Sequence, residues 1–99
     1  MAPTDRHLGT DSVPLATLHK GARGVVTQVL EGDAGIVGDE AGATIGRRLI
    51  EIGFVAGERV QIIEEVWPGG DPMAVRVGTS VFALRRREAR AVLVQVDAP

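Results

Sequence analysis

The stretch that decides the fold is residues 47–96, RRLIEIGFVAGERVQIIEEVWPGGDPMAVRVGTSVFALRRREARAVLVQV. It begins in an amphipathic helix and continues in segments where apolar and polar residues alternate, each ended by a turn signal. The stretch contains no Cys, no His and no glycine loop suited to a phosphate. It is well specified for folding and poor in reactive side chains. We therefore predict a small barrel that binds a partner and is not an enzyme.

The helix is predicted over about residues 43–52. An apolar stripe marks its inner face: Ile45, Leu49 and Ile52. Gly53 follows the last periodic residue, where a left-handed C-cap favours glycine. We expect Phe54 to fold back on the stripe, and Gly57 to supply the positive φ of the next turn.

Five strands follow from the alternation, at residues 25–30, 59–67, 73–77, 80–84 and 92–96. A helical turn at residues 14–18 precedes the first, and residues 85–90 form a polar turn before the last. Val60, Ile62 and Val66 share one face of the second strand. Glu64 falls on that face too, so we expect a bend or bulge near it. The fold class is mainly β, a small barrel with one short helix between the first and second strands.

The whole chain has ordinary globular composition, with 44% hydrophobic and 24% charged residues among 99. Residues 1–13 are predicted to be a flexible tail, residues 14–97 a single domain, and residues 31–42 a mobile loop. There is no Cys, no signal-peptide pattern and no apolar run near the ~20 residues that span a bilayer. We expect a cytoplasmic protein without membrane insertion. A net charge of −2 provides no bulk attraction to nucleic acid, so no nucleic-acid partner is expected.

A series of residues spread over Leu15 to Val96 resembles the FeoA family of bacterial ferrous iron transport. The resemblance rests on these positions: Leu15, Leu18, Gly21, Gly24, Val26, Arg48 to Phe54, Gly57, Gly70-Asp71-Pro72, Gly78, Phe82 to Arg85, and Glu88-Ala89. The sequence departs from the family pattern at Ala56, where proline is common, and in its longer loop at residues 31–42.

The resemblance implies an SH3-like barrel, a fold also found as the C-terminal domain of DtxR-type iron-dependent repressors. It implies an accessory role with FeoB, a membrane permease that carries a cytoplasmic G-protein domain. Two alternatives stay open. One is a regulatory module of metal-dependent transcription, related to the repressor domain. The other is a GTPase-activating role in which one of Arg85, Arg86 and Arg87 serves as an arginine finger.

The candidate partner-binding residues are basic, apart from one indole: Arg47, Arg48, Trp67, Arg85, Arg86 and Arg87. The arginines form either a solvated rim that pairs locally with Glu51 and Glu88, or a positive patch for an acidic partner surface. Trp67 is either a lid over one barrel end or an exposed anchor for a partner. Three aromatics and no Tyr are too few for a proline-peptide groove or an RNA-stacking surface.

No cofactor and no metal site are expected. Only His7 and His19 could supply imidazole ligands, and they lie in the predicted tail and the N-terminal turn. Gly70-Asp71-Pro72 is interpreted as a structural turn, because Asp71 can bond its own backbone and Pro72 can begin a strand. No segment has the pattern of a nucleotide phosphate loop. A weak homo-oligomer is compatible with the sequence.

Overall fold

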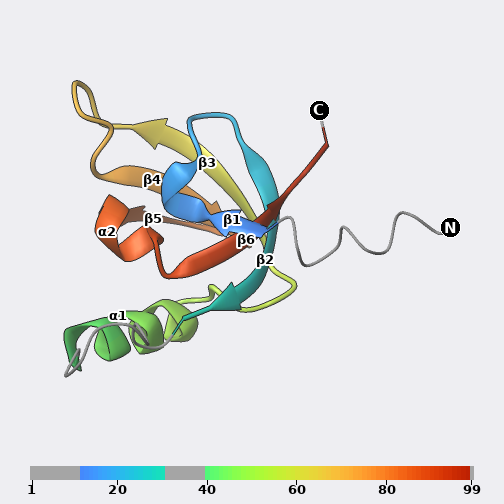
Figure 1. Cartoon of the computed structure of the whole chain (residues 1–99). Coiled ribbons are helices and arrows are strands. Elements are labelled where there is room, and N and C mark those ends of the chain that lie inside the picture. Colours follow the sequence, from blue (N-terminus) through green and yellow to red (C-terminus); the bar gives the residue numbers. More distant parts are fainter. Residues whose placement is uncertain (1–11, 31–39, 99) are drawn as a thin grey trace, which may run out of the picture.

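The computed structural model describes residues 12–30 and 40–98, with side chains from Ile45 onward in the second range. Figure 1 shows a curved antiparallel sheet with one long helix below it and two short helical turns against it. The elements are β1 (Ser12–Pro14), the 3-10 helix η2 (Leu15–Thr17), β2 (Arg23–Val29), α1 (Glu40–Glu51), β3 (Arg59–Glu65), β4 (Met73–Val77), β5 (Ser80–Leu84), α2 (Arg86–Ala89) and β6 (Val92–Val96).

The sheet has six strands in the order β1-β6-β2-β3-β4-β5, so the prediction of five strands missed one. The additional strand is β1, in which Ser12 pairs with Gln95 and Val13 with Val94. These two residues were predicted to end the flexible tail; residues 1–11 lie outside the described part. β1 has only three residues, too few for an alternating pattern that would predict a strand. Its pairing partner, β6, lies about eighty residues further along the chain.

The strand interiors follow the alternation in the sequence. In β4, Met73, Val75 and Val77 are buried, whereas Arg76 is exposed. The register of β3 against β4 shifts between Ile62 and Glu64, which confirms the irregularity expected there. β3 ends at Glu65, before the predicted limit at residue 67. Val66 lies beyond it, is 48% exposed and does not share the buried face as predicted.

Helix α1 begins at Glu40, so residues 40–42, predicted as loop, belong to the helix. The rest of that loop, residues 31–39, lies outside the described part. The C-terminus of α1 forms the expected cap. Gly53 has φ 122° and its amide bonds the carbonyl oxygen of Ile50, while the amide of Phe54 bonds that of Leu49. This is a Schellman motif, and it carries Phe54 back into the core beside Leu49.

The core joins every strand from β2 to β6 with both short helices. Its fully or nearly fully buried members are Leu15, Val26, Leu49, Phe54, Val60, Ile62, Met73, Val75, Val77, Leu84, Ala89, Val92 and Val94. Ala89 reaches it because residues 86–89, predicted as part of a polar turn, form the single helical turn α2. The half-buried Phe82 packs at the edge of this core, its ring 6.4 Å from that of Phe54.

Candidate partner-binding surface

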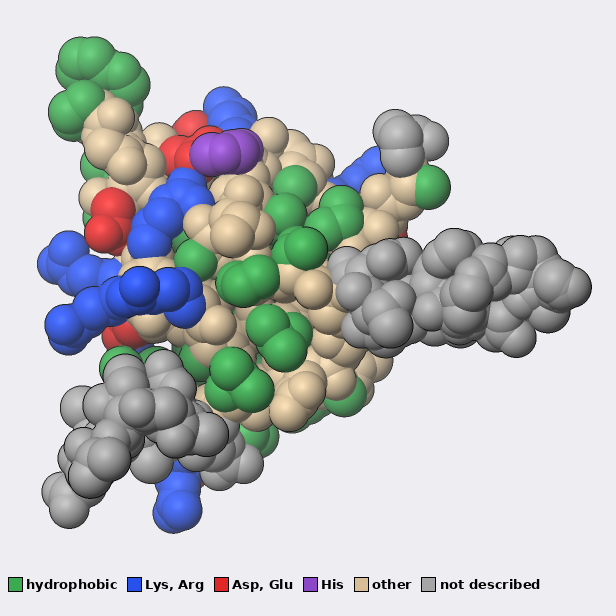
Figure 2. Space-filling model, viewed as in Figure 1, with side chains coloured by type: hydrophobic (Ala, Val, Ile, Leu, Met, Phe, Trp, Pro, Cys, Tyr) green, Lys and Arg blue, Asp and Glu red, His purple; other side chains and the backbone are tan. Residues whose placement is uncertain are grey.

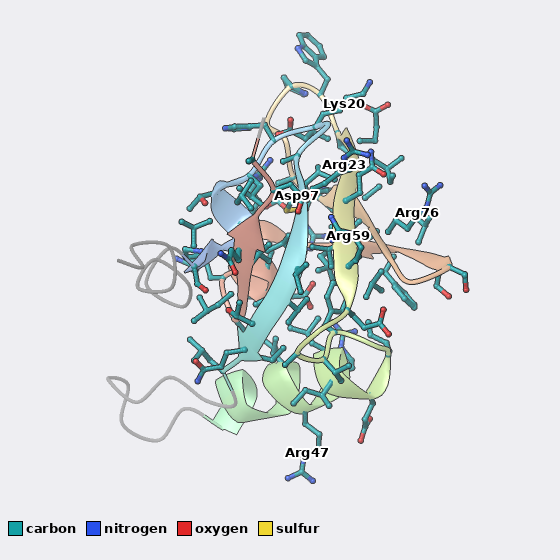
Figure 3. The ribbon with its side chains drawn as sticks, turned by 90° about the vertical axis from the view of Figure 1, so that its right-hand side faces the viewer. Lys20, Arg23, Arg47, Arg59, Arg76 and Asp97 are labelled. Carbon is teal, nitrogen blue, oxygen red and sulfur yellow. The ribbon has the colours of Figure 1, made fainter. Side chains whose placement is uncertain are left out.

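The six candidate residues come from three elements. Arg47 and Arg48 lie on the exposed side of α1, and Figure 3 shows Arg47 pointing away from the sheet. Arg85, Arg86 and Arg87 surround the start of α2, next to the loop at residues 66–72 that carries Trp67. The fold thus brings the loop that carries Trp67 next to the α2 arginines. Among the described residues, the ion pair of Arg48 with Glu88 is the one link between the α1 arginines and α2.

Arg86 is a structural residue of the fold. Its Nε donates to the carbonyl oxygen of Gly70 at 2.8 Å, and its Nη1 donates to those of Ala16 at 2.6 Å and Leu18 at 3.0 Å. Its Nη2 pairs with the carboxylate of Glu65. Four of the five N–H donors of the guanidinium are therefore used within the chain. The sequence groups Arg86 with its neighbours as a surface residue, but its charge is committed to holding η2, β3 and the 66–72 loop against α2.

Glu65 is the acidic partner in this network. Its carboxylate also accepts from the backbone amide of Lys20 at 2.9 Å and lies 3.2 Å from Nδ1 of His19. These contacts hold the pKa of the Glu65 carboxyl below its ordinary value of 4.5, the Lys20 hydrogen bond having the largest effect and that of His19 the next. Glu65 therefore stays charged near neutral pH and keeps Arg86 in place.

The 66–72 loop is closed by hydrogen bonds at its base. The amide of Gly70 donates to the carbonyl oxygen of Val66 at 2.6 Å, and the amide of Val66 donates to that of Pro72 at 3.1 Å. Oδ1 of Asp71 accepts from the backbone amide of Arg86 at 3.0 Å. Gly70-Asp71-Pro72 is therefore a structural turn, as predicted, but Asp71 bonds the amide of Arg86 and not its own backbone. This bond fastens the loop to the first residue of α2.

Trp67 stands at the exposed end of this loop. Its exposed fraction is 87%, the largest among the large apolar side chains of the described residues. A side chain this exposed cannot close a barrel end, so the lid interpretation is wrong. The indole is held away from the body by a braced loop, which is the geometry that the anchor interpretation requires.

The remaining arginines divide into paired and unpaired. Arg48 bonds the carboxylate of Glu88 at 2.6 Å, and the same carboxylate accepts from the backbone amide of Arg85 at 2.9 Å. The expected pairing with Glu88 is therefore present. Within residues 12–30 and 40–98, no ion pair is formed by Glu51, nor by Arg47, Arg85 or Arg87. The α2 side of the molecule thus displays two exposed guanidinium groups, those of Arg85 and Arg87, without an internal counter-charge in that part of the chain.

A second basic region is not evident from the sequence. Arg23, Gln61 and Arg76 lie in register across β2, β3 and β4. Figure 3 shows Arg23 and Arg59 on the sheet face turned away from α2, Lys20 on the turn above them, and Arg76 toward the edge of that view. Arg59 is neutralised by Asp97, and Lys20 lies 3.2 Å from Glu64. The signal is weak in the sequence, because these residues are isolated along the chain and only the strand register assembles them.

The histidines and acids of the described residues do not gather into a metal site. No group of three potential ligands is present there. The side chain of His19 is 79% exposed and contacts only Glu65 among the acids in this part. His7 lies outside the described residues. No helix in the same part of the chain is long and apolar enough to cross a membrane.

Comparison with known proteins identifies the family. Residues 13–96 match the model of the FeoA domain. The Stenotrophomonas maltophilia FeoA, solved in complex with zinc and described as an SH3 domain protein, is 37% identical; the match covers 84% of this chain and 93% of that one, with a TM-score of 0.67. The FeoA-like protein of Clostridium acetobutylicum is 24% identical, with coverages of 90% and 91% and a TM-score of 0.71. No curated protein matches significantly.

Metal-dependent repressors share the fold at lower identity. The IdeR protein of T. acidophilum is 17% identical over 87% of this chain but only 34% of its own, with a TM-score of 0.63. These neighbours share the fold of this chain. The S. maltophilia relative, described as an SH3 domain protein, confirms the expected SH3-like fold. The match to the family model extends over most of the chain, from β1 to the end of β6. The chain therefore belongs to the FeoA family of ferrous iron transport.

Proposed function

We propose that this protein is a non-enzymatic accessory of ferrous iron uptake, which binds a FeoB-type permease at its cytoplasmic G-protein domain and modulates it. The observation that carries the proposal is the family match over residues 13–96. The S. maltophilia relative is described as a candidate activating factor of bacterial ferrous iron transport. We infer that an activating factor of this kind acts on the permease that carries the iron.

The charge of the folded body supports an acidic partner. Although the whole chain has a net charge of −2, residues 12–30 and 40–98 hold ten Lys and Arg against eight Asp and Glu. Several of these acids are occupied by internal ion pairs. Arg85 and Arg87 are exposed on the α2 side and are available to an acidic surface. Exposed charges of this kind mainly accelerate and orient association.

Modulation follows if the protein binds one conformation of the permease more tightly than another. A ligand shifts a conformational equilibrium only by its difference in affinity for the two states. The surface held in place by the hydrogen bonds of Arg86 can fit one conformation of the permease better than the other, and binding alone then supplies the difference in affinity. No chemical step on this chain is required.

Two other functions were considered from the sequence, a module of metal-dependent transcription and a GTPase-activating arginine finger. The repressor neighbours support a common fold and, at 17% identity, nothing about transcription. An arginine finger would have to be Arg85 or Arg87, because the guanidinium of Arg86 is bound to Gly70, Ala16 and Leu18.

The test is binding to the FeoB-type permease of the same organism, purified whole and also as its isolated cytoplasmic domain. We expect saturable binding by biolayer interferometry and a change in GTP turnover or iron transport when the protein is added. The proposal is wrong if neither form binds at protein concentrations up to about 100 μM, because the dissociation constant would then exceed the value expected of a transient complex.

A further inference from the structure

The loop at residues 66–72 presents apolar surface that the fold does not use. Trp67 is 87% exposed and Val66 48% exposed. Figure 2 shows this apolar tip projecting from the body on the same margin as the Lys and Arg side chains around α2. Hydrophobic side chains that protrude together and contribute nothing to the core mark interaction sites.

The loop is held in place before any partner arrives. The backbone bonds between Gly70 and Val66 and between Val66 and Pro72 close it on itself. Arg86 then bonds both the carbonyl oxygen of Gly70 and, through its own amide, the carboxylate of Asp71. A loop braced at both ends loses little conformational entropy on binding, which is the condition under which a protruding aromatic contributes most to affinity.

We propose that residues 66–72 form a docking finger that inserts the indole of Trp67 into an apolar pocket of a partner protein, with an acidic rim opposite Arg85 and Arg87. This proposal rests on the proposed function, since the partner tested is the cytoplasmic domain of the permease. Arg86 fixes the finger and stays out of the interface. Its sequence neighbours Arg85 and Arg87 are thereby placed beside the base of the finger, and neither forms an ion pair with another residue of the ranges 12–30 and 40–98.

The residues around the finger favour a protein pocket over a lipid surface. Its base holds three acids, Glu64, Glu65 and Asp71, and four cations, Lys20 and the three arginines at residues 85–87, so positive charge exceeds negative charge by only one. Insertion into an anionic bilayer requires a clear excess of positive charge at the inserting tip. A nearly balanced base with one aromatic side chain at the end matches instead the centre of a protein interface, where Trp is enriched among the residues that dominate binding.

Trp67 is the only tryptophan in the chain, which makes the finger directly observable. The protein labelled with 5-fluorotryptophan has a single indole fluorine resonance. In the free protein we expect the large H2O/D2O shift of an exposed ring. On addition of the unlabelled cytoplasmic domain, we expect the resonance to move and that solvent shift to disappear.

The matched variants are Trp67→Ala and Val81→Ala. Val81 is also an exposed apolar residue, at 51%, but lies on β5 away from the finger. We expect Trp67→Ala to weaken binding about tenfold or more, as at an interface hot spot, and Val81→Ala to leave it unchanged. Both variants are expected to melt like the wild type, because neither side chain is part of the core.

Three outcomes are distinguishable. Wild-type binding that Trp67→Ala does not weaken overturns the docking finger and leaves the proposed function standing. Failure of the wild type to bind the domain or the whole permease overturns the proposed function and the finger's assignment with it. If the fluorine resonance moves with phosphatidylglycerol vesicles and not with the domain, the finger inserts into a membrane and the protein-pocket proposal is wrong.

Discussion

The guanidinium of Arg86 donates from Nε to the carbonyl oxygen of Gly70 at 2.8 Å, which joins α2 directly to the loop that carries Trp67. This single contact separates the roles of three consecutive arginines. Arg86 is directed inward and holds the docking finger, whereas Arg85 and Arg87 remain exposed on either side of it in the sequence. It also explains how a loop with two exposed apolar residues keeps a defined position.

Replacing Arg86 with Ala should lower both stability and the order of the docking finger. The carbonyl groups of Gly70, Ala16 and Leu18 lose their donor, at a cost on the order of 1–3 kcal/mol in the free energy of unfolding. Urea denaturation measures this loss, and a fall in the fluorescence anisotropy of Trp67 reports the looser loop. Arg87→Ala is the control, with an expected change within about 0.5 kcal/mol. Equal stability of the two variants would show that the network contributes nothing.

Reversing the charges of Arg85 and Arg87 should slow association with the permease's cytoplasmic domain. Because steering acts on exposed charges, we expect the on-rate of the Arg85→Glu/Arg87→Glu variant to fall by roughly three- to thirtyfold at low salt, with a smaller difference as salt rises. Stopped-flow binding at two salt concentrations measures both. The control reverses Arg23 and Arg76, which lie in the row across β2 to β4. The same loss in both variants would mean that net charge, and not the α2 surface, is responsible.

Truncating Leu49 should destabilise the whole domain. The side chain of Leu49 is fully buried, so Leu49→Ala removes core volume where α1 meets the barrel. The capping bond from the amide of Phe54 to the carbonyl oxygen of residue 49 is a backbone bond and is retained. The expected loss is about 2–5 kcal/mol by urea denaturation. Arg47→Ala, on the exposed side of the same helix, should leave stability nearly unchanged. An unaltered denaturation midpoint for Leu49→Ala would mean that α1 is not docked.

Adding one methyl group at Gly24 should be severely destabilising, because the strand pairing leaves no room for it. A Cβ atom there would lie 2.6 Å from Cγ1 of Val94 and would also meet the carbonyl oxygen of Gln95. We expect Gly24→Ala to cost roughly 1–3 kcal/mol, as overpacking does, or to prevent folding. Gly69 has no atom within 4 Å of such a methyl group, so Gly69→Ala should be nearly neutral. Circular dichroism melts of the two variants decide the matter, and similar melts would contradict the close approach of β2 and β6.

The Glu65 carboxylate should make stability depend on acid pH. Its pKa in the folded protein lies below 4.5, so its contribution is fully present above that pH and is lost as the pH falls through the folded-state pKa. We therefore expect Glu65→Gln to be less stable than the wild type at pH 7, with a difference that shrinks below pH 4.5. Urea denaturation across this range measures it. Glu64→Gln, which changes the neighbouring exposed carboxylate, should show little difference at any pH. A constant gap for Glu65→Gln would contradict the lowered pKa.

Much of the fold is determined by the sequence alone, because its local signals agree with its long-range packing. The alternation from Met73 to Val77 specifies β4, and the glycines at Gly53 and Gly78 stand where the chain adopts positive φ. The stripe on α1 and the motif series were enough to indicate an SH3-like barrel of the FeoA family. These features succeed because side-chain periodicity and backbone conformation are local properties.

Only the tertiary structure decided the rest, and the reason in each case is distance along the chain. β1 is a strand because Ser12 and Val13 pair with β6. A segment of three residues is too short to carry an alternation that predicts this pairing. Arg85, Arg86 and Arg87 are chemically identical, yet Arg86 alone meets Gly70, Ala16 and Leu18, from 16 to 70 residues away. The exposure of Trp67 likewise depends on how the 66–72 loop is fastened to α2. The sequence determined which residues are available for a partner. Contacts that only folding creates decided which of them support the structure and which stay exposed on the surface.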